Sequence, residues 1–201
     1  GTSFLDRARA YAEVPWRQVE SRRPFEHQTA ALNAWREARR RGVVVLPTGA
    51  GKTHVAILAI EEVGRSSLVV VPTLDLLEQW CEALRLAFGV PVGRIGGGVH
   101  RIEELTVITY ASATRRAIEI GNRFGLVVFD ECHHLPGGKN ARAGVASIAP
   151  YRLGLTATPE RGDGGEEEFR SLIGPIVCRR EVGEMVGEVL SDYEVVTIEV
   201  Q

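Results

Sequence analysis

A short apolar run followed by a glycine-rich turn is the feature that most limits how this chain can fold. Val43 to Leu46 are typical of a buried strand, and a helix is expected from about Lys52 to Val63. Between them lies the segment Pro47-Thr48-Gly49-Ala50-Gly51-Lys52-Thr53. A strand, a glycine-rich loop and a helix in this order are the setting of a phosphate-binding loop. The segment opens with proline rather than with the glycine of the wider GxxxxGK[ST] pattern.

Each residue type in this loop suits contact with a nucleotide. Backbone N–H groups at the turn and helix N-terminus cradle phosphate, and glycine lets the backbone approach closely. Lys52 would neutralise the terminal phosphates, and the Thr53 hydroxyl would bind Mg²⁺. The residues predicted to bind ATP here are Thr48, Gly49, Ala50, Gly51, Lys52 and Thr53.

The rest of the chain repeats a pattern of short β-branched run, turn and amphipathic helix, which predicts an α/β fold with a mostly parallel sheet between helices. One clear helix carries Leu77, Trp80, Cys81, Leu84 and Phe88 on one face and stops at Gly89. Another carries Trp35 and closes in Arg39 to Gly42, where the arginines are interpreted as a solvated helix end rather than a nucleic-acid patch. Further strands are expected at Leu68 to Val71, Thr106 to Thr109, Leu126 to Phe129, Arg152 to Leu155 and Ile176 to Cys178.

A second polar cluster follows the strand Leu126 to Phe129, at the sheet edge where α/β proteins bind ligands. Asp130 is placed to hold Mg²⁺, and Glu131 to polarise the water that attacks the γ-phosphate. Two acids after a strand are also compatible with an ordinary helix cap. His133 and His134 do not predict a zinc site, because adjacent histidines on a turn face one ion poorly.

Composition narrows the class of protein. Hydrophobic residues make up 44% and charged residues 25%, which excludes a disordered chain, and no apolar run reaches membrane-spanning length. The net charge of -2 means that any nucleic acid would bind through a local surface. Cys81, Cys132 and Cys178 lack CxxC spacing, so we expect reduced thiols in an intracellular protein, cytoplasmic in a prokaryote.

With these sites in place, the chain resembles the DExH-type helicases and translocases of superfamily 2. Leu46 to Thr53 resembles motif I in its helicase form, in which the proline is usual, and Asp130-Glu131-Cys132-His133 resembles motif II. Val71-Pro72-Thr73 resembles motif Ia, Thr109-Tyr110 resembles motif Ic, and Thr156-Ala157-Thr158-Pro159 resembles motif III. The order of the five motifs agrees with the family.

The resemblance implies a role for each matching position. Lys52, Asp130, Glu131 and His133 would be catalytic, and Pro72, Thr73, Thr109 and Tyr110 would grip a nucleic-acid backbone. Tyr110 is compatible with stacking on a base or with the core. Thr156 and Thr158, acting through His133, would couple the γ-phosphate to movement of nucleic acid. Gln28 would read adenine, or serve only as a helix-start residue.

The subfamily resembled is the XPB-type helicases of DNA repair and transcription opening, on the basis of Gly96-Gly97-Gly98 and Leu153 to Thr158. This implies DNA rather than RNA as partner, together with repair or transcription proteins. Those helicases carry an Arg-Glu-Asp element after motif III, where this chain has Arg161-Gly162-Asp163. The resemblance implies that Arg161 and Asp163 share the coupling role of Thr156 and Thr158. Restriction-type translocases, phage-like DExH helicases and RNA helicase motors remain alternatives.

We expect residues 1–24 to form a helical lead-in, residues 25–193 the first RecA-like domain, and residues 194–201 a linker toward a second such domain. Because the family carries its catalytic arginine on that second domain, this chain alone would bind ATP weakly and hydrolyse it very slowly. Two rival hypotheses are a P-loop phosphotransferase with a small acceptor, and a binding module without catalysis.

Overall fold

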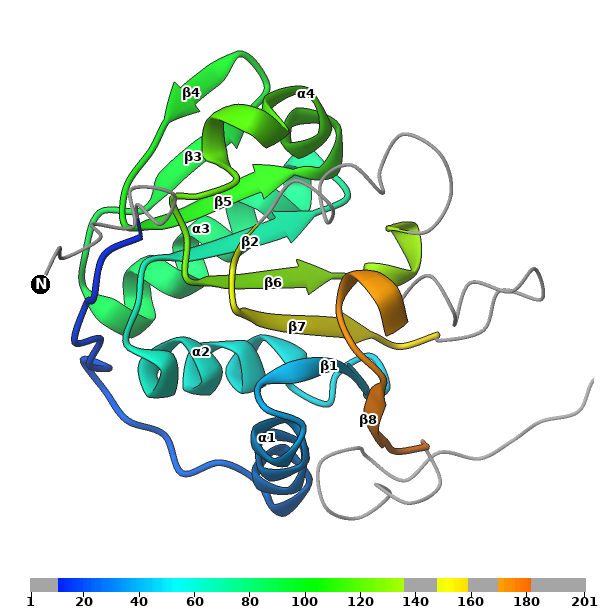
Figure 1. Ribbon diagram of the computed structural model, residues 1–201. Coiled ribbons are helices and arrows are strands. Elements are labelled where there is room, and N and C mark those ends of the chain that lie inside the picture. Colours follow the sequence, from blue (N-terminus) through cyan, green and yellow to red (C-terminus); the bar gives the residue numbers. More distant parts are fainter. Residues whose placement is uncertain (1–10, 136–147, 159–169, 182–201) are drawn as a thin grey trace, which may run out of the picture.

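The sheet of this protein confirms the predicted α/β class. The computed structural model describes residues 11–135, 148–158 and 170–181, and within them eight strands form one sheet in the order β4-β3-β5-β2-β6-β7-β1-β8 (Figure 1). All neighbours pair in parallel except β3 and β4, which are antiparallel. The strands are β1 (Arg41–Val45), β2 (Ser67–Val71), β3 (Gly93–Gly96), β4 (Val99–Arg101), β5 (Leu105–Thr109), β6 (Leu126–Asp130), β7 (Tyr151–Thr156) and β8 (Ile176–Arg179).

Helices lie on both faces of the sheet, as a parallel sheet requires. The helices α1 (Glu26–Glu37), α2 (Lys52–Val63) and α3 (Leu74–Phe88) lie on one side, and α4 (Tyr110–Ile120) lies on the other (Figure 1). Side chains alternate between the two faces along each strand, so Val44 and Val69 join one hydrophobic cluster while Val43 and Leu68 join the other. The inner strands β2, β5 and β6 are therefore buried along their whole length rather than at alternate residues.

The predicted strands and the helix predicted from Lys52 to Val63 agree with the structure to within two residues, but three elements were missed. The hairpin β3–β4 turns at Gly97 and Gly98, which are both in the left-handed region. Helix α4 starts directly after β5, and Thr109 serves as both the last residue of the strand and the N-cap of the helix. The sequence prediction missed this helix because it interprets Thr109-Tyr110 as a motif that follows a strand, and not as the start of a helix.

The predicted helical lead-in is wrong for the described part of it. Residues 11–25 contain no helix, and the segment crosses the surface as extended chain with one bridge between Glu13 and Arg65. Trp16 anchors it, since its ring is buried and its Nε1 donates to the Arg65 carbonyl oxygen at 2.7 Å. Pro15 lacks the N–H that an internal helix turn needs.

The arginines after α1 are arranged differently from the prediction. Helix α1 ends at Glu37, Arg39 and Arg40 have positive φ, and Gly42 lies inside β1 instead of ending the helix. Glu62 of α2 pairs with Arg36 at 2.6 Å and with Arg40 at 3.0 Å. This ion-pair network agrees with a solvated helix end that joins α1 to α2.

The cysteines carry no covalent link. Cys81, Cys132 and Cys178 form no disulfide. Burial raises the pKa of Cys81 to about 11 and raises that of Cys132 further, so neither thiol is activated for chemistry. No helix in the described residues combines the length and apolar character that crossing a membrane requires.

Candidate active site

The topology brings the two predicted nucleotide-binding segments to one edge of the sheet. Strands β1 and β6 both flank β7, and all three run in parallel. Val45 is level with Thr156, and Asp130 is level with Leu155. The phosphate-binding loop after β1, Thr156 at the end of β7 and Glu131 after β6 therefore emerge side by side, with the threonine in the middle.

The loop after β1 has the backbone of a phosphate cradle. Gly49 and Gly51 have φ of 84° and 77°, a conformation that residues with side chains rarely adopt. Gly51 is the N-cap of α2, so the N-terminal N–H groups of a twelve-residue helix open toward the loop. The Lys52 ammonium donates to the Leu46 and Pro47 carbonyl oxygens at 3.1 and 3.3 Å. These groups fit the phosphates of a nucleotide.

Gln28 is hydrogen-bonded to this loop. It is buried, its Nε2 donates to the Ala50 carbonyl oxygen at 3.2 Å, and its Oε1 accepts from the Phe25 N–H at 3.1 Å. The Oε1 also lies 3.0 Å from His54 Nδ1, and His27 Nε2 lies 2.9 Å from the same Ala50 oxygen. Gln28 thus lies in the first turn of α1 and its amide holds the loop, and its contact with adenine stays a prediction. Sequence reasoning missed His27 and His54, because nothing in their local pattern marks them.

Gly51 should not tolerate a side chain. A Cβ there would lie 2.3 Å from Gln28 Nε2, on a backbone with φ of 77°. We expect Gly51→Ala to cost about 1–3 kcal/mol of unfolding free energy and to weaken nucleotide binding at least about tenfold. Urea denaturation and titration with a fluorescent nucleotide measure the two effects.

Gly98→Ala is the matched control for Gly51→Ala. Gly98 has φ of 85° but no atom within 4 Å of an added Cβ, so it carries the backbone strain without the clash. We expect this variant to lose some stability and to bind nucleotide as the wild type does. Equal nucleotide affinities for Gly51→Ala and wild type would contradict the proposed cradle.

Asp130 ends β6 and is held by two aromatic side chains. Its carboxylate accepts a 2.7 Å hydrogen bond from Trp80 Nε1, and its carbonyl oxygen accepts one of 3.0 Å from the Tyr110 hydroxyl. Burial raises the pKa of Asp130, because the charged form loses its water, and the Trp80 hydrogen bond opposes this. A buried carboxylate beside a second acid and near Lys52 fits a divalent cation, for which carboxylate and hydroxyl oxygens are suitable ligands.

Glu131 lies in a strained backbone conformation at the start of the next turn. Its φ of 45° and ψ of 54° are left-handed, which is uncommon for a residue with a long side chain. Its Oε2 lies 3.3 Å from His133 Nδ1 and 3.5 Å from the Thr156 hydroxyl. The same His133 nitrogen lies 2.9 Å from Thr156 Oγ1. The predicted general base Glu131 is thus in contact with His133, which is also predicted to be catalytic, and with Thr156, a predicted coupling residue.

Thr156 also ties this network to the segment that follows β7. Its hydroxyl accepts from the Thr158 N–H at 3.2 Å and lies 3.1 Å from the Thr158 carbonyl oxygen. A shift of this segment would change the contacts of His133 and Glu131. The predicted coupling residues Arg161 and Asp163 lie outside the described residues.

A cleft of about 650 Å³ opens beside this network and joins it to the predicted nucleic-acid residues. Thr73 and Thr109 are the N-caps of α3 and α4, and their hydroxyls accept from the N–H groups of Leu76 and Ser112. Tyr110 is 3% exposed, so its ring belongs to the core and not to a stacking platform. The cleft is lined by Thr48, Pro72, Thr73, Leu76, Tyr110, Glu131, His133, His134, Ala157 and Thr158.

Known proteins are similar to this chain in sequence and in architecture. Residues 21–161 match the family described as type III restriction enzyme, res subunit. The DNA 3'-5' translocase XPB2 of Sulfurisphaera tokodaii is 46% identical over 170 residues, which are 85% of this chain and 38% of that protein. The DNA 3'-5' helicase XPB of Mycobacterium tuberculosis is 37% identical over 157 residues, 73% of this chain and 28% of that protein. The chain thus spans well under half the length of these relatives.

Solved structures of a helicase and of an ATPase core share the fold at low sequence identity. The UvsW helicase of bacteriophage T4 superposes with a TM-score of 0.66 at 21% identity, over 83% of this chain and 64% of that one. The Sulfolobus solfataricus SWI2/SNF2 ATPase core in complex with dsDNA gives 0.63 at 20% identity, over 80% of this chain and 37% of that one. The chain therefore belongs to the family of the type III restriction enzyme res subunit, as a first RecA-like domain of superfamily 2 helicases with XPB-type relatives.

Proposed function

We propose that this chain is the ATP-binding half of a DNA-dependent ATPase motor, a helicase or a double-strand translocase. The observation that carries the proposal is the contact network of Glu131, His133 and Thr156, which lies between the phosphate-binding loop and the cleft. A phosphotransferase with a small acceptor has no need of such a link to strand-end threonines.

The chain's own residues support a division of work in hydrolysis. Lys52 and the N-terminus of α2 would bind the β- and γ-phosphates, and Thr53 and Asp130 would hold Mg²⁺. When bound, Mg²⁺ neutralises charge that develops on the phosphates. Glu131 would orient and polarise the attacking water, while His133 and Thr156 fix the direction of its carboxylate. Gln28 supports the loop on which the phosphates rest.

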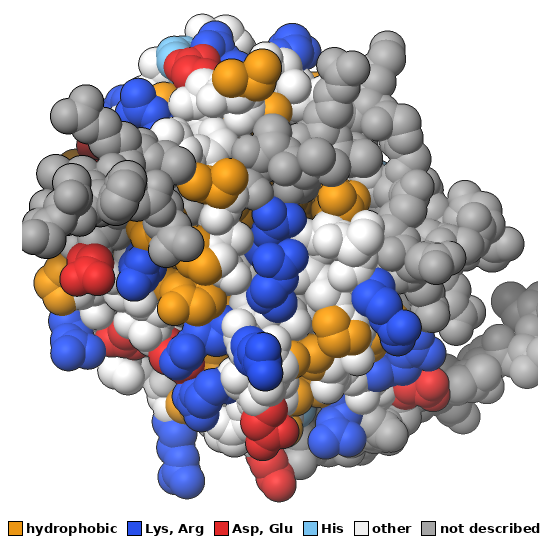
Figure 2. All heavy atoms as spheres, viewed as in Figure 1, with side chains coloured by type: hydrophobic (Ala, Val, Ile, Leu, Met, Phe, Trp, Pro, Cys, Tyr) orange, Lys and Arg blue, Asp and Glu red, His pale blue; other side chains and the backbone are white. Residues whose placement is uncertain are grey.

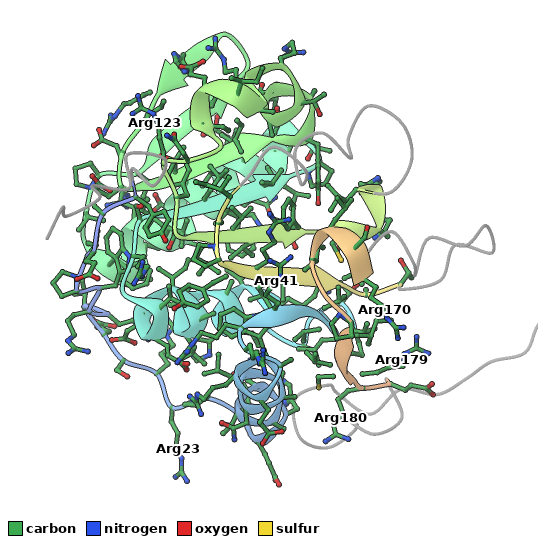
Figure 3. The ribbon with its side chains drawn as sticks, viewed as in Figure 1. Arg23, Arg41, Arg123, Arg170, Arg179 and Arg180 are labelled. Atoms are coloured by element: carbon green, nitrogen blue, oxygen red, sulfur yellow. The ribbon has the colours of Figure 1, made fainter. Side chains whose placement is uncertain are left out.

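Helix dipoles favour a nucleic-acid backbone in the cleft, and basic side chains add positive charge elsewhere on the surface. Helices α3 and α4 both begin at its wall, so the positive ends of two helix dipoles lie there. Lys and Arg side chains also gather down the middle of one face (Figure 2). Figure 3 labels Arg41 there, at the end of β1 away from the phosphate-binding loop, and Arg170, Arg179 and Arg180 around β8, whose last residue is Arg179. The protein thus has a local positive surface despite its net charge of -2.

DNA is the favoured polymer because the XPB-type relatives are named as DNA translocases and helicases. Repair or transcription proteins are proposed as further partners, because one relative is a general transcription and DNA repair factor IIH subunit in Dictyostelium discoideum. A second RecA-like domain would complete the site with an arginine that stabilises the transition state.

The test compares ATP turnover by this chain and by a polypeptide that joins it to a second RecA-like domain. We expect duplex or single-stranded DNA to stimulate the two-domain protein more than RNA does. The 201-residue chain should turn over about 10³- to 10⁵-fold more slowly, because it lacks the arginine of the second domain.

Lys52→Ala in the two-domain protein is the control for contaminating ATPases, and it should remove DNA-stimulated turnover. Stimulation by a small phosphate acceptor, with no response to any polynucleotide, would favour a phosphotransferase instead. Full turnover in Lys52→Ala would exclude the proposed site.

A further inference from the structure

Asp130 is held by a residue of α3 that no motif assigns. Trp80 lies near the middle of α3, its ring is 3% exposed, and its Nε1 donates to Asp130 Oδ2 at 2.7 Å. The two residues are 50 positions apart and come from a helix and a strand. The bond therefore exists only because α3 packs against the sheet where β6 ends.

The three tryptophans differ in what their indole groups bind. Trp16 and Trp35 donate to the main-chain carbonyl oxygens of Arg65 and Arg152, whereas Trp80 donates to a carboxylate. A hydrogen bond to a charged acceptor is stronger than one to a neutral acceptor and fixes the rotamer of the acid. The Trp80 contact thus sets where the second carboxylate oxygen of Asp130 can go.

Helix α3 also reaches the cleft. Its N-cap is Thr73, and Leu76 in its first turn lines the cleft four residues before Trp80. Residues four apart lie on the same side of a helix, so the two side chains form one continuous strip. A rigid fifteen-residue helix that moves at Thr73 must also move at Trp80.

We propose that Trp80 is a positioning residue that links the grip of α3 on nucleic acid to the metal-binding carboxylate of Asp130. When a nucleic-acid strand binds at the N-terminus of α3 and the helix shifts, the Trp80 indole hydrogen bond shifts with it. This changes the affinity of the Asp130 carboxylate for Mg²⁺. Tyr110 keeps the main chain of Asp130 in place, since its hydroxyl donates to the Asp130 carbonyl oxygen. The inference rests on the proposed function, because it needs Asp130 to be the metal ligand.

The first test follows the indole N–H resonance of Trp80 in ¹⁵N-labelled chain, assigned with Trp80→Phe. We expect the resonance to move when Mg²⁺ is added in the presence of a non-hydrolysable ATP analogue, while those of Trp16 and Trp35 stay in place. This measurement uses the wild-type protein, and Trp16→Phe and Trp35→Phe assign the other two indole resonances, so it remains decisive if Trp80→Phe fails to fold. A Trp80 resonance that ignores Mg²⁺ while nucleotide binds would overturn the proposal.

The second test compares Trp80→Phe with Trp35→Phe, which also loses a buried indole donor but lies away from Asp130. We expect Trp80→Phe to raise the Mg²⁺ concentration for half-maximal nucleotide binding about 10- to 100-fold, as loss of a hydrogen bond to a metal ligand commonly does. Binding of metal-free nucleotide should not change. In the two-domain protein, DNA should no longer alter the Mg²⁺ requirement of the variant. Trp35→Phe should reduce the melting temperature without changing any of these values.

Asp130→Asn separates the two ways in which the idea can fail. If Asp130→Asn abolishes Mg²⁺-dependent binding and Trp80→Phe leaves it at the wild-type level, the indole is structural only and the inference is wrong. If both Asp130→Asn and Trp80→Phe leave Mg²⁺-dependent nucleotide binding intact, Asp130 is not the metal ligand, and the proposed function loses its metal site.

Discussion

Glu131→Gln should lower kcat for DNA-stimulated ATP hydrolysis by about 10²- to 10⁴-fold, with ATP affinity changed by less than about threefold. The amide keeps the size of the side chain and the left-handed backbone of residue 131, but it cannot accept a proton from water. It can still contact His133 and Thr156, so the surrounding network should persist. Steady-state kinetics and fluorescent-nucleotide titration of the two-domain protein measure both quantities.

Glu119→Gln is the matched control for this experiment. Glu119 is a carboxylate on α4 that pairs with Arg116 and His100 at the surface, away from the phosphate-binding loop. Its loss should change kcat by less than about twofold, since exposed ion pairs contribute little. Turnover in Glu131→Gln close to the wild-type rate would show that another group activates the water.

Trp35→Ala should have the largest effect on stability, with a loss of about 3–5 kcal/mol in unfolding free energy. Trp35 is fully buried between α1 and the sheet, and its Nε1 donates to the Arg152 carbonyl oxygen at 2.8 Å. Truncation leaves a large cavity and a buried carbonyl oxygen without its donor. Such a loss is a large share of the about 5–15 kcal/mol that holds a typical domain together, and urea denaturation measures it.

Ile118→Ala serves as the control for Trp35→Ala, because Ile118 is 96% exposed on α4. Its unfolding free energy should change by less than about 0.5 kcal/mol. Nucleotide binding by Trp35→Ala at a temperature where it remains folded should match that of the wild type. A loss below about 1 kcal/mol would mean that α1 contributes little to the core.

Features that depend on neighbouring residues in the chain could be predicted from the sequence. The run Val43 to Leu46, the glycines of the loop and the start of α2 at Lys52 are contiguous, and each local preference supports the same structure. The same holds for β6 and the acids that follow it. By contrast, the conformation of residues 11–25 depends on how this segment packs on the rest of the protein. Trp16 is buried and donates to the carbonyl oxygen of the distant Arg65, and the expected helix does not form.

The partners of the site residues could not be read from local pattern. Thr73 and Thr109 are predicted to contact phosphate, and the structure adds that their hydroxyls cap α3 and α4. Gln28 is predicted to read adenine, and the structure adds that its amide holds the carbonyl oxygen of Ala50, 22 positions away. Both outcomes depend on how each helix meets the sheet.

By itself the sequence determined a parallel sheet, a phosphate-binding loop and a pair of acids at one sheet edge, because hydrophobic period and turn chemistry act over a few residues. Only the tertiary structure decided that β7 lies between β1 and β6, so that Thr156 meets His133, and that α3 places Trp80 on Asp130. Those contacts join residues 23 and 50 positions apart, and packing of whole elements, rather than local preference, sets the distances between them.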